Sequence, residues 1–146
     1  MTGFVHAALG AMLGKFIHDP LLAFGAGVGS HVVGDMVPHH DMDIGEVPLV
    51  FGTLIYVAYE HGWKSPQFWG ALGAVSPDFE HISYELKKDP RRFGPMPEKM
   101  VPTHNGTLEH GSWPLDAKYG VMLNFALFIA GLWLAGTLAK RAPGTY

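Results

Sequence analysis

The histidines and carboxylates of this chain fall into short clusters whose spacing suits a metal ion. His31 and Asp35 are four residues apart, so on a helix they share one face and can reach the same ion. Pro38 ends that helix and leaves His39 and Asp41 beyond it, as further ligands or as the catalytic base. The alternative for the first pair is a His–Asp hydrogen bond that only fixes helix packing.

Two later clusters offer donors of the same kind. Asp78 and His81 are three residues apart and project to one side, at a point where Pro77 bends or interrupts a helix. The alternative here is an interfacial turn with solvated charges. His104 and His110 lie around a glycine-containing turn, where they either cap the metal site or belong to a solvated loop.

His6 stands alone in the first apolar segment, where a single histidine is more often a packed core residue, but the other donors make it a candidate ligand. The chain has no cysteine, so any ion must be held by nitrogen and oxygen atoms. We expect zinc first, with manganese or iron as alternatives, and one or two ions. The predicted metal ligands are His6, His31, Asp35, His39, Asp78, His104 and His110, and the predicted catalytic residues are Asp41 and His39.

The composition indicates contact with lipid. Hydrophobic residues make up 48% of the 146 residues and charged residues 16%, and the mean hydropathy is +0.14. Soluble domains carry roughly 25% charged residues, so this chain is unusually poor in charge. The formal charge of -3 and the pI near 6.3 leave no basic field, and we therefore expect no nucleic-acid partner.

Polar residues in the apolar stretches recur at spacings of three and four, which predicts helices and argues against strands. The expected helices are Gly3 to Ile17, Leu21 to Val37, Val47 to Glu60, Pro66 to about Leu86, and Tyr119 to Leu138. The last has twenty residues and matches the thickness of a bilayer core, although a buried core helix in a soluble bundle is the alternative. The sequence therefore predicts one all-α domain over residues 1–146, an integral-membrane bundle of about five helices.

Small residues recur in three of these helices. In water such glycines weaken a helix, whereas in lipid they allow neighbouring backbones to approach closely. We therefore expect a glycine-rich, helix-packed core. The residues concerned are Gly10, Gly14, Gly25, Gly27, Gly29, Gly70, Gly73 and Ala74.

In chain order the motifs are His6, the run Ser30-His31-x-x-x-Asp35-x-x-Pro38-His39-x-Asp41, the pair Pro77-Asp78, and the late His104 and His110. This order resembles the small membrane-bound metal-dependent hydrolases, including the group related to the LexA-binding inner-membrane hydrolases. The resemblance implies a multi-helix protein of the bacterial inner membrane with a metal site. Glu80 stands where an aspartate is expected, and the sequence after His104 matches the family's late motif only loosely.

Three functions follow from these residues. The leading hypothesis is a membrane-embedded hydrolase that uses metal-activated water on a lipid or lipid-linked ester or phosphoester. The second is a non-catalytic accessory subunit of a membrane complex with a structural metal or cofactor site. The third is a metal or proton carrier that uses the same intramembrane His and Asp residues. An exchangeable coordination position favours the hydrolase, and a closed site favours the structural role.

Overall fold

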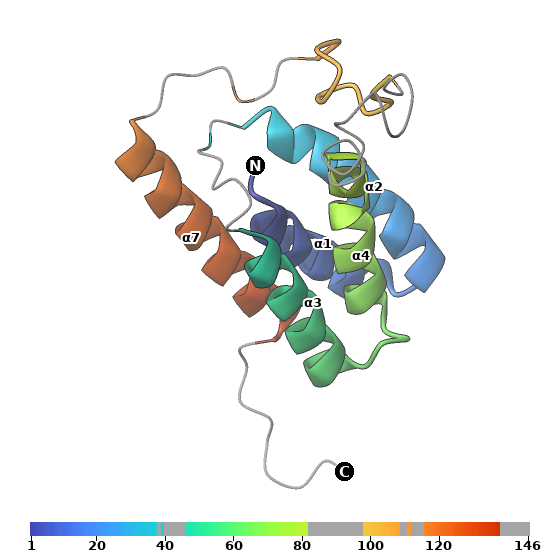
Figure 1. Cartoon of the computed structure of the whole chain (residues 1–146). Coiled ribbons are helices and arrows are strands. Elements are labelled where there is room, and N and C mark those ends of the chain that lie inside the picture. Colours follow the sequence, from blue (N-terminus) through green and yellow to red (C-terminus); the bar gives the residue numbers. More distant parts are fainter. Residues whose placement is uncertain (38, 40–45, 82–97, 109–110, 112–115, 138–146) are drawn as a thin grey trace, which may run out of the picture.

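The computed structural model describes residues 1–37, 39, 46–81, 98–108, 111 and 116–137. Over these residues the chain is all-helical and contains no strand, as the sequence predicts. Within these described residues lie five α-helices and one 3-10 turn (Figure 1). They are α1 (Gly3–Ile17), α2 (Pro20–Asp35), α3 (Val47–His61), α4 (Pro66–Val75), η2 (Ser76–Asp78) and α7 (Ala117–Ala135).

Helix α1 lies at the centre of the bundle and contacts α2, α3, α4 and α7 (Figure 1). Phe4, Val5 and Ala7 are at most 1% exposed, and they point to different sides of the helix. A helix that is apolar on all sides must be covered on all sides, and the four surrounding helices provide that cover. The start of α1 therefore becomes the buried point around which other helix ends gather.

Local capping sets the helix starts. The side chain of Asp19 accepts a hydrogen bond from the Leu22 N–H at the start of α2, and Ser65 accepts one from the Phe68 N–H at the start of α4. Each cap is followed by a proline, which suits the first helical position because its missing N–H would have no partner there. The predicted bounds of α1 are confirmed, and α2 ends two residues earlier than predicted, at Asp35.

The predicted interruption at Pro77 is confirmed. Helix α4 ends at Val75, and the backbone continues as the 3-10 turn η2 before helical residues resume at 79–81. Proline removes a backbone donor and disfavours the preceding helical geometry, so the α-helical ladder breaks here. This turn directs Asp78 toward the start of α1, where its Oδ2 atom lies close to Gly3. The predicted continuation to Leu86 lies outside the described residues.

Glycines allow three helices to touch at backbone distance. A Cβ atom added to Gly10 in α1 would lie 2.2 Å from the carbonyl oxygen of Gly70 in α4, and one added to Gly73 would lie 2.1 Å from a carbonyl oxygen of α2. The predicted close approach is confirmed at these positions. The prediction of close approach is wrong for Gly25 and Gly29, where an added Cβ meets no atom of the described structure within 4 Å.

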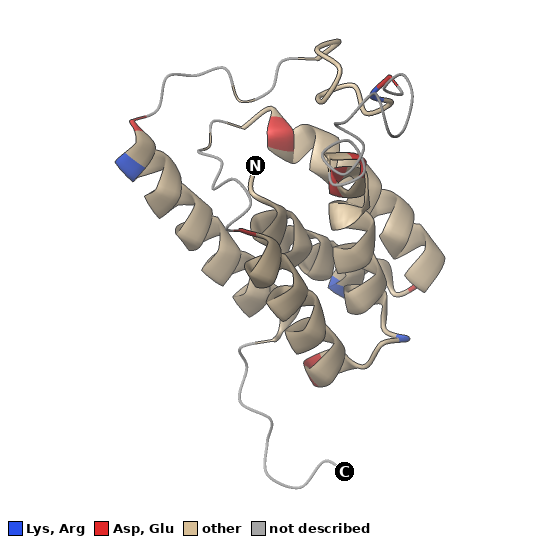
Figure 2. Ribbon diagram, viewed as in Figure 1, with Lys and Arg blue, Asp and Glu red and all other residues tan. Residues whose placement is uncertain are grey.

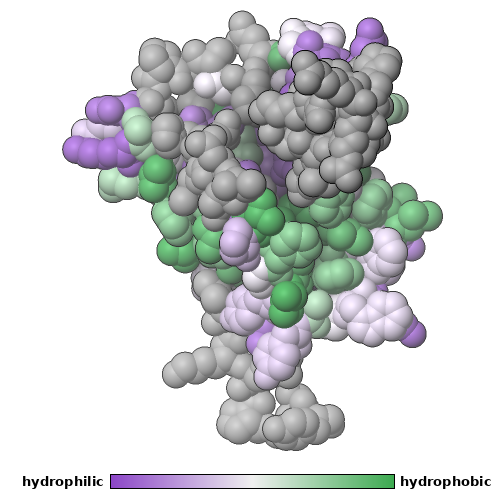
Figure 3. All heavy atoms as spheres, in the orientation of Figure 1, coloured by the Kyte–Doolittle hydropathy of each residue, from purple (hydrophilic) through white to green (hydrophobic). Residues whose placement is uncertain are grey.

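Charged residues avoid the middle of every helix. Within the five α-helices they are Lys15, Asp35, Glu60 and Lys118, and each lies in a terminal turn. Figure 2 shows the consequence: the central parts of the ribbons carry neither acidic nor basic residues. On the face drawn in Figure 3, hydrophobic residues gather over the middle of the bundle and hydrophilic ones mainly toward its ends.

Helix α7 is the one described helix that is long and apolar enough to cross a membrane. It has 19 residues, and 22% of its most hydrophobic window is buried inside the protein. Met122, Ile129 and Trp133 are each more than half exposed along its outer side. A core helix of a soluble protein is mostly buried, so α7 differs from that class in its exposure. Length and composition thus support one membrane span.

The glycine contacts predict unequal effects of two similar substitutions. Gly10→Ala places a methyl group against the backbone of α4, so we expect it to lower stability by about 1–3 kcal/mol or more. Gly25→Ala adds a methyl group in open space and improves helix propensity by about 1 kcal/mol, so we expect stability to stay equal or rise. Thermal loss of helical circular dichroism in detergent measures both, and equal melting of the two variants would contradict the packing.

Candidate metal centre

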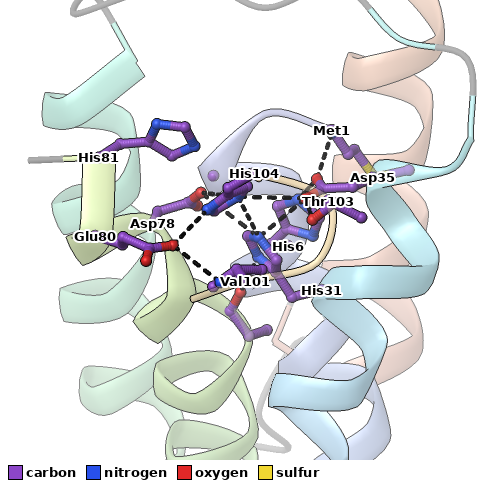
Figure 4. A network of polar contacts seen from close by, with 12 residues as sticks. Met1, His6, His31, Asp35, Asp78, Glu80, His81, Val101, Thr103 and His104 are labelled. Atoms are coloured by element: carbon purple, nitrogen blue, oxygen red, sulfur yellow. Dashed lines mark hydrogen bonds and ion pairs between the residues drawn. The ribbon is translucent and has the colours of Figure 1, made fainter. Parts of the chain in front are cut away.

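Five acidic and imidazole side chains from four separate segments converge at one end of the bundle (Figure 4). The first turn of α1, the last turns of α2, the turn η2 and the irregular segment 98–108 each supply at least one. These segments are far apart in the sequence, so the convergence is a product of the fold. The side chains are His6, His31, Asp35, Asp78 and His104.

Four donor atoms in this cluster have the spacing of ligands around one ion. The Nε2 atom of His31 lies 3.2 Å from Nε2 of His104 and 3.1 Å from Oδ2 of Asp35. Nε2 of His104 lies 3.5 Å from the same Asp35 oxygen. Oδ1 of Asp78 lies 3.7 Å and 4.0 Å from the two Nε2 atoms. Ligand atoms about 2.0–2.1 Å from a tetrahedral zinc ion lie about 3.3–3.4 Å from one another, so the cluster has the size of one ion.

The partners of the two imidazoles define which nitrogen of each ring carries the hydrogen when the ring is neutral. His31 Nδ1 lies 2.8 Å from the carbonyl oxygen of Ala74, which can only accept, so Nδ1 carries the hydrogen. His104 Nδ1 lies 3.3 Å from Oε2 of Glu80 and donates to that carboxylate. In a neutral ring Nε2 is then the acceptor. Burial acts to lower the pKa of His31, but its hydrogen bond to Asp35 and the charges of Asp78 and Asp35 outweigh burial and raise the pKa, and a protonated His31 donates from Nε2 to Asp35. Metal-binding histidines in proteins show this arrangement, with the second nitrogen held by a carbonyl or a carboxylate.

Two imidazole nitrogens and two carboxylate oxygens therefore face one another, and all but the Asp78 side chain, which is 27% exposed, are buried. His31 is fully buried, Asp35 is 1% exposed, and the His104 side chain is also 1% exposed. Lone pairs and negative charge at such short distances repel strongly where water cannot screen them. A proton on His31 relieves part of this repulsion, and a divalent cation among the donors would relieve more of it. The buried His and Asp groups can thus hold a metal ion, and their donor chemistry fits zinc, manganese or iron.

Asp35 is held by donors on both of its oxygens. Oδ1 accepts from the Met1 nitrogen at 2.8 Å and from His6 Nε2 at 2.9 Å. Oδ2 accepts from Thr103 Oγ1 at 2.8 Å, on the side that faces the two other imidazoles. A carboxylate in this environment needs such donors to remain ionised. The Asp35 oxygens are consequently fixed in one orientation toward the candidate metal centre.

His6 packs flat against His31, with ring centroids 4.1 Å apart. Gly34 makes this possible, because a Cβ atom there would lie 2.9 Å from the His6 ring. His6, His31 and Asp35 also bring one donor atom each within 4.8 Å of one another, so they form a second possible ligand group. His6 therefore lies at the centre as predicted, where it either orients Asp35 or binds an ion with it.

Asp78 differs from Asp35 in having few donors. Its Oδ2 atom is buried and has no hydrogen-bond partner among the described residues. Burial raises the pKa of Asp78, and the nearby His31 ring offsets only part of that rise. An unsatisfied buried carboxylate oxygen is costly, so this side chain is suited to receive a cation or a donor from a bound molecule.

Glu80 connects the imidazole of His104 to the backbone next to it. Its two oxygens accept hydrogen bonds from the N–H groups of Met100 and Val101, and Oε2 also accepts from His104. Burial acts to raise the pKa of Glu80, but these hydrogen bonds outweigh it and hold the pKa below its usual value. The carboxylate therefore stays ionised and orients a metal-ligating ring.

The remaining predicted site residues lie at or beyond the edge of the centre. His39 Nε2 lies 2.6 Å from the Met1 nitrogen and so reaches Asp35 only through that nitrogen. It belongs to neither group of converging donor atoms found among the described residues. Asp41 and His110 lie outside the described residues.

Sequence reasoning assigned no role to two residues that contact the ligands. Thr103 donates to Asp35, and Glu80 accepts from His104. One feature of the sequence could have indicated a role for Glu80, because it follows Asp78 by two residues at a helix end that was predicted to carry ligands. No feature of the sequence indicated a role for Thr103, because a hydroxyl in a polar loop is usually solvated. His81 lies beside the centre, with its ring 4.0 Å from that of His104.

The fold and site define an all-α protein with a buried His–Asp centre that can hold a metal ion. Comparison of the chain with protein-family models, curated proteins and solved structures found no match. The resemblance to membrane-bound hydrolases thus stays a prediction, and the chemistry must be argued from the site itself.

Metal content tests the centre directly. Purified protein equilibrated with zinc and then dialysed should retain about one ion per chain, because the donors are buried and preoriented. His31→Ala and Asp35→Ala should retain almost none. His18→Asn is the matched control, since His18 is exposed at the far end of α1 in a left-handed conformation that asparagine tolerates. Wild-type protein without metal, or full metal in both site variants, would exclude the centre.

Proposed function

We propose that this protein is a membrane-embedded, metal-dependent hydrolase that acts on a lipid or lipid-linked ester or phosphoester. The donor set is the observation that carries the proposal. Structural zinc sites are mostly built from cysteine and closed by four ligands, whereas catalytic sites combine histidine and carboxylate ligands with an exchangeable position. This chain has no cysteine, and its centre consists of histidine and aspartate alone.

The spacing of the donors supports an exchangeable position. His31, Asp35 and His104 form the compact part, with separations of 3.1–3.5 Å, and Asp78 lies farther from the rings, at 3.7 and 4.0 Å. Three compact donors are the usual protein contribution to a catalytic zinc site. A divalent ion held by them would lower the pKa of coordinated water to about 7.

Asp78 is the best-placed general base in this proposal. It borders the compact donors, and its buried Oδ2 atom has no partner among the described residues. Such a carboxylate can accept a proton from water and then donate it to the leaving group. Among the residues first considered as base, His39 lies one contact further away, beyond the Met1 nitrogen.

The distribution of charge supports a membrane location. The helix middles carry no charged residue, and α7 exposes large apolar side chains along its length. Helices of 15 residues span about 22 Å and are shorter than a bilayer core of about 30 Å, so α7 is the spanning helix, and α1 packs against it. The centre lies at an end of the bundle, which suits a substrate whose head group is at the interface. We assign this membrane to the bacterial inner membrane on the motif resemblance.

One observation favours a second function. His31, Asp35 and His104 have side chains at most 2% exposed, and with Asp78 they would also suit a closed structural ion in an accessory subunit of a membrane complex. Both functions require metal, so a measurement of metal content does not distinguish them. Hydrolysis by the isolated, metal-loaded chain distinguishes them, because only the hydrolase cleaves a substrate.

Metal-dependent hydrolysis is the central prediction. In detergent, the zinc-loaded protein should cleave bis(p-nitrophenyl) phosphate or p-nitrophenyl butyrate, and a chelator should abolish the release of nitrophenolate until zinc is restored. Asp78→Asn should lower kcat about 100-fold or more while retaining the metal, because it removes the proton acceptor.

Asp116→Asn is the matched control for that experiment, because Asp116 is exposed beside α7 and away from the centre. It should hydrolyse both esters at the wild-type rate. No hydrolysis of either ester by metal-loaded wild-type protein would contradict the proposal and favour the accessory subunit. Loss of metal from Asp78→Asn would instead make Asp78 an essential ligand and exclude it as the base.

Membrane integration can be tested by placing a lysine at two different positions along α7. Ile129 is 56% exposed near the middle of α7, and a lysine at the centre of a membrane helix costs about 2.5–3.5 kcal/mol. Ile129→Lys should therefore move the protein toward the alkaline-carbonate supernatant. Tyr119→Lys, at the start of the same helix, should leave it in the pellet. Wild-type protein found in the supernatant would be incompatible with the proposal.

A further inference from the structure

The segment of residues 98–108 covers the candidate metal centre without being part of the helical bundle (Figure 4). It consists of turns, whereas His6, His31, Asp35 and Asp78 lie on helices or on the 3-10 turn. It nevertheless supplies His104. Part of the ligand set is thus mounted on a rigid scaffold and part on an irregular segment.

This segment is held to the bundle by polar contacts. Glu80 accepts hydrogen bonds from the backbone of Met100 and Val101 and from His104, and Thr103 donates to Asp35. None of its residues belongs to the hydrophobic clusters formed by the described residues. Polar attachments of this kind open at a much lower free energy than a packed helix does.

The segment has both buried and exposed side chains. Thr103 is 4% exposed on its inner side, and Met100 is 87% exposed on its outer side. Beneath it, His31 and Asp35 are at most 1% exposed. A substrate as large as a lipid head group can reach these donors only when a covering segment moves away.

We propose that residues 98–108 are a lid that the bound ion closes, and that Glu80 is the positioning residue that holds the lid shut. The lid rests on the proposed function, because a hydrolase must admit its substrate and then exclude bulk water. Closure brings His104 to the ion and Thr103 to Asp35, and it completes the site.

The ion closes the lid because the closed form offers one more ligand. In the closed form, Nε2 of His104 lies 3.2 Å from Nε2 of His31 and 3.5 Å from a carboxylate oxygen of Asp35, so the three atoms can bind one ion together. His31 and Asp35 are fixed on α2, whereas His104 moves with the lid. An ion therefore has more ligands in the closed form and binds that form more tightly, which shifts the population toward closure.

Glu80 is suited to its role because both oxygens are used. Oε1 accepts from Met100, and Oε2 accepts from Val101 and from His104, so one carboxylate fixes the lid backbone and the ligand ring together. Replacement by glutamine puts an N–H₂ group where one acceptor stood. The ring then loses its orientation, and the backbone loses a hydrogen bond.

Hydrogen exchange of the full-length protein in detergent tests the lid without any substrate. In wild-type protein, zinc should slow amide exchange in the peptide that covers residues 98–108 by about tenfold or more. Exchange in residues 3–17 of α1 should not change. Glu80→Gln should lose this protection even with zinc bound, and its zinc affinity should fall about 10–100-fold.

Glu98→Gln is the matched control, since Glu98 is exposed on the same segment and undergoes the same change of charge. It should behave as wild type in both measurements. Equal exchange in residues 98–108 with and without bound zinc would overturn the lid. Wild-type protection in Glu80→Gln would overturn the role of Glu80. Zinc-dependent protection in a protein that hydrolyses no ester would keep the lid and contradict the hydrolase, so the two failures are distinguishable.

Discussion

The close approach of four ligand atoms from separate segments governs the site of this protein. His31, Asp35, Asp78 and His104 place two imidazole nitrogens and two carboxylate oxygens 3.1–4.0 Å apart. In a low dielectric such atoms need a proton or a cation between them. The Ala74 carbonyl and the Glu80 carboxylate hold the Nδ1 atoms of the two rings and so orient both Nε2 atoms toward one another. The centre can therefore hold a metal ion.

The glycine contacts of the bundle bring these donors together. Gly10, Gly70 and Gly73 let α1, α2 and α4 approach until their backbones touch, and the ends of these helices then meet around the centre. At the break after α4, Pro77 turns Asp78 inward, because the helical ladder cannot continue through it. Packing and chemistry are therefore coupled, since a wider spacing of the helices would separate the ligands by more than one ion can bridge.

Rigid and movable parts of the centre have different roles in the proposed reaction. Helix-borne donors keep an ion in place, and the segment of residues 98–108 decides whether a substrate can reach it. The donor chemistry favours an exchangeable coordination position, and the charge-free helix middles favour a location in lipid. The proposed interfacial location and the proposed lid both fit a substrate with an apolar tail and a hydrolysable head group.

Most of the local structure was determined by the sequence alone. Polar spacing predicted the helices, the four-residue separation predicted that His31 and Asp35 share a face, and Pro77 predicted the break. These features depend on neighbours a few residues away. Only the tertiary structure decided that Thr103 and Glu80 contact the ligands, that Gly25 faces open space, and that Asp78 keeps an oxygen without a partner. Those outcomes depend on how helices cross and how a loop folds back, and residue periodicity carries no information about either.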